Sequence, residues 1–336
     1  MAEPQIPRYP VFSPRSSLSC LKDTRTRMTD LTDRKAPLDV LVGERPMDAT
    51  DAAAARLEAR EAAGELRARW APGDITLRHA DFLAHLHELD DGSVDLILAD
   101  PPYGLGKDYG NDSDKRSGED FLGWTYGWLE AALPKLAPRG SLYLFCTWQY
   151  APELFVFLKQ RMLMINEIIW DRRVPSMGGS TRRFSSVHDN IGFFAVSKDY
   201  YFDLDAVRVP YDAATKKARS RRIFEGSKWL ELGYNPKDLW SISRLHRQDP
   251  ERVDHPTQKP LHIIERMVLA SCPPGGLVLD PFMGSGTTAV ACALHGRRFV
   301  GFELNAHYHA LANQRLQRLS DHVPHSSDVP SLASAG

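Results

Sequence analysis

The chain has 336 residues, of which 43% are hydrophobic and 25% are charged, and its formal net charge at pH 7 is −1. This composition predicts a globular protein and excludes attraction to nucleic acid through the field of the whole molecule, so any such attraction must come from local clusters of charge. Four widely separated cysteines predict neither a disulfide framework nor a metal site, and they fit a cytoplasmic protein without a membrane-spanning run or a secretion signal.

The first part of the chain predicts little folded structure. Residues 1–48 mix Pro, Ser, Arg and Thr with little periodicity, so we expect a disordered arm. Apolar residues then recur among Arg and Glu side chains up to Trp70, which predicts an amphipathic helix within residues 49–73. This helix could pack on the rest of the chain, pair with a second subunit in a homodimer, or remain solvated.

Two strands that end in an acid are predicted next. Residues 75–81 predict a strand leading to Asp81, with a helix over residues 82–89. Residues 94–99 form a short apolar run that predicts a buried strand. That strand must end at Asp100, because the two prolines that follow lack the backbone donor that strand pairing needs. Ligands bind at the carboxyl edge of open α/β sheets, and this turn lies there.

The turn Asp100-Pro101-Pro102-Tyr103 has the groups needed to activate a planar amine. The lone pair of an exocyclic amine on a nucleobase is delocalised into the ring, so the amine is a poor nucleophile until acceptors bind both N–H bonds. Asp100 and the Pro101 carbonyl could be these acceptors, and Tyr103 could stack on the base. Taken alone, the tetrapeptide could equally be a strand-ending turn with a surface tyrosine.

The middle of the chain combines strand patterns with clusters of basic residues. Residues 104–118 predict a long loop, residues 121–133 a helix, and residues 141–146, 165–170 and 189–196 strands. Cys146 ends the first of these strands without the Pro-Cys context of a methyltransferase nucleophile, so we interpret it as structural. Several basic side chains could contact DNA or could form solvated faces: Arg182, Arg183, Lys216, Lys217, Arg219, Arg221, Arg222 and Arg244.

The last third of the chain predicts a nucleotide site. His255 to Pro260 is a proline-bracketed turn before a helix over residues 261–271, and Thr257 and Lys259 suit the carboxylate end of a cofactor. Residues 276–280 predict a strand ending at Asp280, followed by a glycine-rich turn and a helix that Thr287 or Thr288 could cap. A third strand ends at Glu303, which could hold the ribose hydroxyls of an adenosine cofactor. The incomplete glycine pattern favours S-adenosylmethionine over a dinucleotide.

Three motifs in this order resemble the permuted, beta-group DNA amino-methyltransferases of bacterial restriction-modification systems: Asp100 to Tyr103, His255 to Pro260, and Asp280 to Thr287. The resemblance covers residues 74–320. It implies an α/β, Rossmann-like methyltransferase fold that is circularly permuted, with a mostly parallel sheet, helices on both faces and a small target-recognition insertion. The implied division is a catalytic half at 74–203, the insertion at 204–254, a cofactor half at 255–320 and a polar tail at 321–336.

The resemblance also implies the reaction and its site residues. A methyl group would pass directly from S-adenosylmethionine to the amine of a base flipped out of double-stranded DNA, with N6 of adenine favoured over N4 of cytosine because the turn begins with Asp. Asp81 would lie near the adenine of the cofactor. The implied cofactor residues are Asp81, Asp100, Thr257, Lys259, Asp280, Phe282, Gly284, Ser285, Gly286, Thr287 and Glu303. A cognate restriction endonuclease is an implied partner.

Three other interpretations remain. An RNA or protein-glutamine methyltransferase would use a similar turn, usually beginning with Asn. A nicotinamide enzyme would bind a dinucleotide instead of S-adenosylmethionine. A catalytically silent DNA-binding subunit would transfer nothing, and the intact Asp100 and Tyr103 argue against it.

Overall fold

The computed structural model describes residues 71, 73–104, 116, 118–174, 181–220 and 228–321. The predicted arm at 1–48, nearly all of the predicted helix at 49–73 and the tail beyond Asp321 lie outside these residues, as does most of the predicted loop at 104–118. The side chains of 217–220, 228, 229, 320 and 321 are also outside the description.

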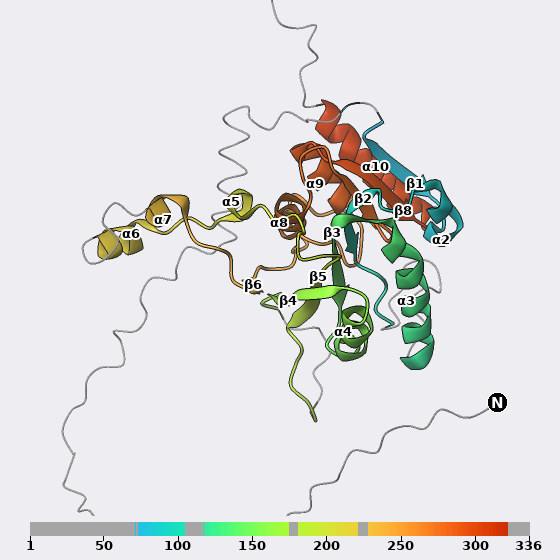
Figure 1. Cartoon of the computed structure of the whole chain (residues 1–336), viewed down its shortest axis with the longest axis horizontal. Helices are drawn as coiled ribbons and strands as arrows, with labels where there is room; N and C mark the ends of the chain where they lie inside the picture. The colour runs from blue at the N-terminus through green and yellow to red at the C-terminus, as the bar shows by residue number, and fades with distance from the viewer. Residues whose placement is uncertain are drawn as a thin grey trace, which may run out of the picture. The chain divides into compact units, whose positions relative to one another are not determined.

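The described strands form one eight-stranded sheet in the order β1-β8-β7-β2-β3-β5-β4-β6 (Figure 1). Among these strands β5 alone runs antiparallel to its neighbours. The strands are β1 (Ile75–His79), β2 (Val94–Ala99), β3 (Leu136–Cys146), β4 (Leu163–Asp171), β5 (His188–Ala195), β6 (Leu239–Ser241), β7 (Leu277–Asp280) and β8 (Arg298–Glu303). The predicted mostly parallel, Rossmann-like sheet is therefore confirmed.

The strands of the C-terminal part lie inside the sheet formed by the N-terminal part. β7 pairs with β2, and β8 pairs with both β7 and β1, so β7 and β8 separate two strands that are close in sequence. As a result, the carboxyl ends of β1, β8, β7 and β2 are neighbours at one edge of the sheet. This order is the permuted arrangement that the sequence motifs predict.

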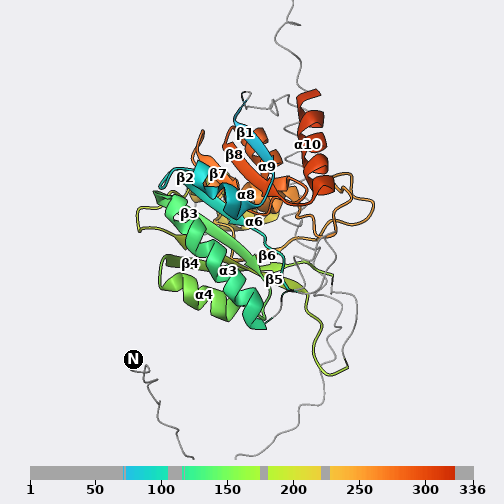
Figure 2. The ribbon, with the colours of Figure 1, turned by 90° about the vertical axis from the view of Figure 1, so that its right-hand side faces the viewer.

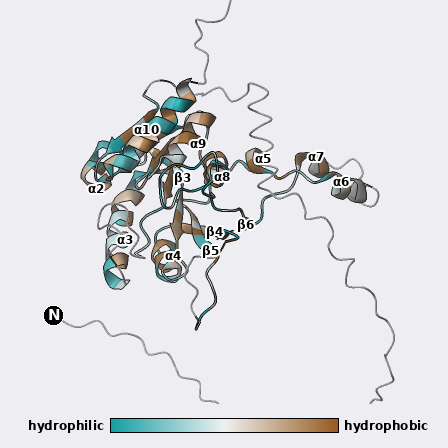
Figure 3. Cartoon of the chain, turned by 180° about the vertical axis from the view of Figure 1, so that it is seen from behind, coloured by the Kyte–Doolittle hydropathy of each residue, from teal (hydrophilic) through white to brown (hydrophobic). Residues whose placement is uncertain are grey.

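Helices cover both faces of the sheet (Figure 2). One face packs against α8 (Leu261–Ser271), α9 (Thr287–His295) and α10 (Ala306–Asp321). The other packs against α2 (Phe82–His85), the short 3₁₀ turn η2 (Leu86–Glu88), α3 (Gly118–Ala132) and α4 (Ala151–Lys159). In Figure 3 strand β3 is coloured as hydrophobic and α10 largely as hydrophilic, as expected for a central strand and a covering helix.

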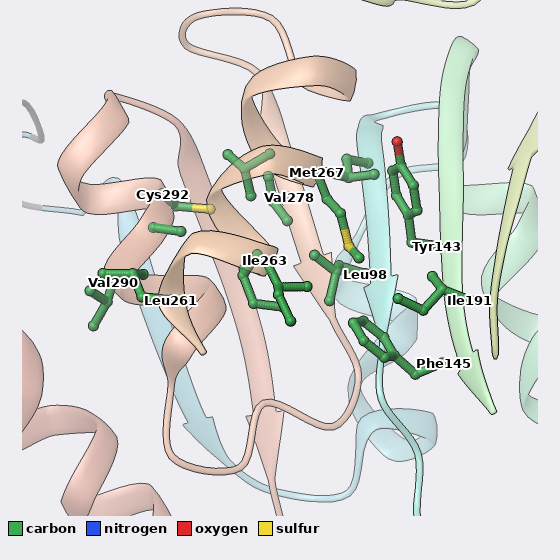
Figure 4. Close-up of a cluster of buried hydrophobic side chains, with 14 of the residues drawn as sticks. Leu98, Tyr143, Phe145, Ile191, Leu261, Ile263, Met267, Val278, Val290 and Cys292 are labelled. Atoms are coloured by element: carbon green, nitrogen blue, oxygen red, sulfur yellow. The ribbon is translucent and has the colours of Figure 1, made fainter. Parts of the chain in front are cut away.

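Strand β2 shows why a continuous apolar run is needed here. Leu96 and Leu98 belong to the core under α8 and α9, whereas Ile97 and Ala99 belong to the core under α3 and α4. Figure 4 shows Leu98 and Val278 facing Ile263 and Met267 of α8. Because successive side chains of a strand point to opposite faces, a strand buried on both faces needs apolar residues at successive positions, as in Leu96 to Ala99.

Several elements differ from the sequence-based expectation. Helix α3 ends at Ala132 and is followed by the 3₁₀ turn η4 (Leu133–Lys135), and β3 begins at Leu136 rather than at residue 141, so the strand includes Pro138. A register shift between β2 and β3 near Val94 and Leu96 accommodates the proline. Residues 204–254 contain α5 (Leu204–Val207), α6 (Ala213–Ser220) and α7 (Lys228–Leu232), and β6 from this region joins the main sheet.

Candidate active site

Four acids follow the neighbouring ends of β1, β2, β7 and β8. They are Asp81, Asp100, Asp280 and Glu303, and all four line one cavity of about 410 Å³ at the carboxyl edge of the sheet. Apolar and aromatic side chains form the rest of its wall, including Leu98, Trp124, Trp128, Ile264, Phe282 and Phe302. Among the aromatic residues of α3, Phe121 and Trp128 are buried, and Trp124 and Trp128 line this cavity.

The glycine-rich turn after β7 is held by the acids beside it. Gly284 has a φ of 50° and Gly286 a φ of 78°, both in the left-handed region. The Gly284 N–H donates to Glu303 Oε2 at 3.0 Å, and a Cβ at Gly284 would lie 2.9 Å from His255 Nε2. A side chain at this position would therefore disrupt the wall of the cavity.

Asp280 is buried and has a structural role in the same turn. Its Oδ1 accepts from the Phe282 N–H at 3.0 Å and its Oδ2 from Thr288 Oγ1 at 2.6 Å. Burial raises the pKa of Asp280 to about 7. Helix α9 begins after Gly286 without a side-chain cap, so the prediction that Thr287 or Thr288 caps it is wrong. Their hydroxyls bond elsewhere, Thr288 to Asp280 and Thr287 to the Lys259 carbonyl at 3.4 Å.

The other two acids at this edge also accept backbone N–H groups. Glu303 Oε1 accepts from the Asn305 N–H at 2.7 Å, and burial raises the pKa of Glu303 above its ordinary value. Asp81 Oδ1 accepts from the Leu83 N–H at 2.9 Å and caps α2. Each carboxylate retains lone pairs for a ligand, because a carboxylate has about four acceptor positions.

The Asp100 turn separates this first cavity from a second one. The Tyr103 hydroxyl donates to Asp100 Oδ1 at 2.7 Å, and the Lys259 ammonium forms an ion pair with Asp100 Oδ2. Asp100 and Pro102 line the first cavity, whereas Tyr103 lines the second. Lys259 lines both, together with Thr257 and Gln258.

The second cavity is wider, at about 1120 Å³, and its wall is aromatic and basic. Its aromatic residues are Tyr103, Trp148, Trp170 and Phe184, and its arginines are Arg172, Arg183, Arg244, Arg247 and Arg252. Trp148 is half exposed and Phe184 fully exposed. Most of these residues belong to three segments: the turn after β3, the loop between β4 and β5, and the loop before the His255 motif.

The structure brings together only part of the predicted DNA-binding set. Arg183 and Arg244 line the second cavity, while Arg182 is exposed and is not among its lining residues. Lys216 on α6 lies 3.4 Å from Glu231 in an ion pair. The side chains of Lys217 and Arg219, and both Arg221 and Arg222, lie outside the described residues.

Arg315 and Glu251 hold the glycine-rich turn in place, and no local pattern in the sequence indicates either residue. Arg315 Nη1 donates to the Ser285 carbonyl and to Thr287 Oγ1, both at 2.9 Å. Arg315 Nη2 lies 3.6 Å from Glu251 Oε1, which also accepts from the Leu261 N–H at 2.9 Å. Burial raises the pKa of Glu251 to about 7, although Arg315 opposes this shift. The pair thus links α10 to the glycine-rich turn and to α8.

His255 and Cys146 are buried groups without a reactive environment. Burial lowers the pKa of His255 to about 4, so its ring is neutral near pH 7, and it packs edge-on against Tyr308 at 4.5 Å between ring centroids. Burial raises the pKa of Cys146 far above its ordinary value, as expected for a structural thiol. Within the residues that the structure describes, His, Cys, Asp and Glu side chains form no group of three placed to hold a metal ion.

None of the described helices combines the length and the apolar character that crossing a bilayer requires.

Comparisons with known proteins agree with this geometry. Residues 94–314 match the model of a family described as DNA methylase, N6_N4_Mtase. The chain is 37% identical over 233 residues to the type II methyltransferase M.HpaI of Haemophilus parainfluenzae, covering 69% of this chain and 70% of that protein. It is 31% identical over 247 residues to the DNA adenine methyltransferase YhdJ of Escherichia coli, covering 72% and 82%. The fold resembles that of M1.HpyAVI in its complex with SAM, with a TM-score of 0.52 and 24% identity, covering 72% of this chain and 98% of that one.

Proposed function

The chain belongs to the N6_N4_Mtase family of DNA methylases, and from that membership we propose that it transfers a methyl group from S-adenosylmethionine to the exocyclic amine of a base flipped out of duplex DNA, with N6 of adenine favoured. The observation that carries this proposal is the position of the Asp100 turn, which lies between an acidic cavity of about 410 Å³ and a basic, aromatic cavity of about 1120 Å³.

The first cavity fits an adenosine cofactor. Glu303 and Asp81 offer carboxylates for hydroxyl and amino groups, and Gly284 and Gly286 let the backbone approach a ligand closely. Trp128 lines the cavity, and its buried indole N–H has no hydrogen-bond partner among the described residues. Lys259 and Thr257 lie where a carboxylate could be bound. When bound, S-adenosylmethionine would supply an electrophilic methyl group.

The second cavity fits the flipped base. Tyr103 and Trp170 offer aromatic surfaces for stacking, and Asp100 with the Pro101 carbonyl would accept the two N–H bonds of the amine. These acceptors would draw the nitrogen lone pair out of the ring and toward the methyl group. Asp100 would then take up the proton that the nitrogen loses. Holding both reactants against one turn would provide much of the rate.

The arginines around the second cavity would bind the DNA. Because the net charge of the chain is −1, the attraction must come from such a cluster. Arg183 lies on the loop between β4 and β5, and Arg244 and Arg247 lie on the loop before the His255 motif, so the two loops could contact phosphates on either side of the flipped nucleotide. The basic run from Lys216 to Arg222, which the sequence places in the recognition insertion, is proposed to extend this surface.

N4 of cytosine is the main alternative target, because both amines present two N–H donors to the same acceptors. Asp at position 100 favours adenine by resemblance alone, and the adenine specificity of YhdJ agrees with it. An RNA or protein-glutamine substrate remains a weaker alternative. We also propose that the protein acts in the cytoplasm, that a cognate restriction endonuclease accompanies it, and that it could act as a homodimer through residues 49–73.

The proposed function is tested by incubating the protein with labelled S-adenosylmethionine and genomic DNA that lacks this methylation, followed by nucleoside mass spectrometry. N6-methyladenine is the expected product. N4-methylcytosine would preserve the mechanism and change the target. Failure to label DNA, together with labelling of RNA or protein under the same conditions, would overturn the proposal. Once DNA is labelled, sequencing that detects modified bases would map the recognition site.

A further inference from the structure

Lys259 occupies the wall between the two cavities and belongs to the lining of both. Its side chain is 8% exposed, and its ammonium pairs with Asp100, which lies 159 positions away in the sequence. Among the described residues that line the first cavity, Lys259 and Arg116 carry positive charge, whereas Asp81, Asp100, Asp280 and Glu303 are acids. An anionic group that enters this cavity would therefore be attracted to Lys259.

Asp100 already has a donor on each of its oxygens. The Tyr103 hydroxyl donates to Oδ1 at 2.7 Å, and the Lys259 ammonium contacts Oδ2. An approaching amine would have to share these acceptors. The nitrogen also becomes positively charged as it accepts a methyl group, so an ammonium on the same carboxylate would oppose the reaction. The contact between Lys259 and Asp100 is thus unfavourable for the proposed transfer.

The same ammonium lies near three aromatic rings, of which Tyr103 and Trp170 line the second cavity. Its Nζ is 5.4 Å from the ring centroid of Tyr103, 5.0 Å from that of Phe145 and 6.0 Å from that of Trp170. Tyr103 and Trp170 are the rings on which a flipped base would stack. Lys259 therefore fills part of the space between the aromatic wall and Asp100, and cation–π attraction helps to hold it there.

We propose that Lys259 is a switch that releases Asp100 only when the cofactor's carboxylate is bound. In this proposal, which rests on the proposed function, the ammonium exchanges one carboxylate partner for another, so the number of ion pairs is conserved. The exchange frees Asp100 Oδ2 to accept an N–H of the target amine and clears the aromatic wall for the base. Cofactor binding then strengthens binding of the flipped base, and the base strengthens cofactor binding by the same factor.

Two cofactor analogues test this switch without methyl transfer. S-adenosylhomocysteine retains the amino-acid carboxylate, and 5′-methylthioadenosine lacks it. The dissociation constant of a duplex carrying the mapped site is measured alone and with saturating amounts of each compound. We expect S-adenosylhomocysteine to tighten DNA binding about 10-fold and 5′-methylthioadenosine less than about twofold. Equal effects of the two compounds would overturn the proposal.

Variants assign the effect to Lys259. In Lys259→Met, both compounds should change DNA affinity less than about twofold. Asp100→Asn should also lose the coupling, which is the tightening of DNA binding by S-adenosylhomocysteine, because position 100 no longer holds the ammonium. Lys159→Met, at an exposed position on α4, is the matched control and should retain it. Affinity for 5′-methylthioadenosine, which does not need the carboxylate contact, checks that each variant keeps its first cavity.

The result separates this switch from the proposed function. Persistence of the 10-fold coupling in Lys259→Met would exclude a role for the lysine. The unmodified protein could transfer methyl groups to DNA while the two analogues have equal effects on its DNA affinity. This result would overturn the proposed switch and leave the proposed function intact. Should Lys259→Met fail to fold, the comparison of analogues in the unmodified protein still decides the outcome.

Discussion

The two cavities beside Asp100 are built from different kinds of structure. The first is formed by the ends of parallel strands in one sheet, and three of its acids, Asp81, Asp280 and Glu303, are fixed by backbone N–H groups at 2.7 to 3.0 Å. The second is formed by loops, and it includes the fully exposed Phe184 and the half-exposed Trp148. The first is thus preorganised for a ligand of one shape, whereas the second can adapt to a large and variable partner.

Among the predicted changes, removal of the Asp100 carboxylate between the two cavities should have the largest effect on methyl transfer. Asp100→Ala removes the proposed acceptor for the target amine from the turn between the two cavities, so we expect kcat to fall about 10³-fold while S-adenosylhomocysteine still binds. Single-turnover methyl transfer and calorimetric binding measure the two quantities. Asp91→Ala, at an exposed turn, serves as the control. Turnover close to that of the unmodified protein would remove Asp100 from the mechanism.

A change in the first cavity should affect the cofactor alone. Glu303→Gln removes the charge and one of the two oxygens that accept the Gly284 and Asn305 N–H groups, so we expect affinity for S-adenosylhomocysteine to fall about 10-fold. DNA affinity measured without cofactor should stay unchanged. Asp199→Gln, at an exposed loop position, is the control. A matching loss of DNA affinity would show that the two cavities are not separate in function.

A change in the second cavity should affect DNA alone. Replacing Arg183 and Arg244 together by Ala should weaken DNA binding and reduce the slope of log K against log salt concentration by about 1.8, if each arginine binds one phosphate. Arg78 and Arg139, which pair with Glu88 and Asp199, provide a control pair outside this cavity. An unchanged salt slope would place the phosphate contacts elsewhere, with the basic run at 216–222 as the next candidate.

The smallest predicted effect is on stability, and it arises beneath the first cavity. Burial raises the pKa of Glu251 to about 7 from 4.5, so between these pH values the folded protein holds a proton that the unfolded chain has released. The unfolding free energy should therefore fall as pH rises from 5 to 8. Glu251→Gln should reduce this fall, and the difference in Tm between pH 5 and pH 8 should shrink by a few degrees. An identical pH profile would indicate that Glu251 titrates normally.

The contrast between the cavities also explains which parts of the site could be predicted. Asp100, Asp280 and Glu303 each follow an apolar run, and parallel strands bring such ends to one edge, so a local pattern was sufficient. Trp148 and Arg172 reach the second cavity through tertiary packing of loops, which no spacing in the sequence encodes. The ion pair between Lys259 and Asp100 spans 159 positions for the same reason. Strand β3 begins before the expected residue 141 and includes Pro138, because a shift in strand register accommodates the proline.

The pairing of β8 with β1 has a consequence for how the protein is synthesised. His79 is in register with Glu303, and the Ala80 N–H donates to the Glu303 carbonyl at 3.1 Å. The strands that are first and last in the sequence are therefore neighbours in the sheet, beside the first cavity. While a ribosome is still translating residues before β7, β1 and β2 have emerged without the two strands that join them. Nascent chains should therefore expose unpaired strand edges and need protection from aggregation until translation is almost complete.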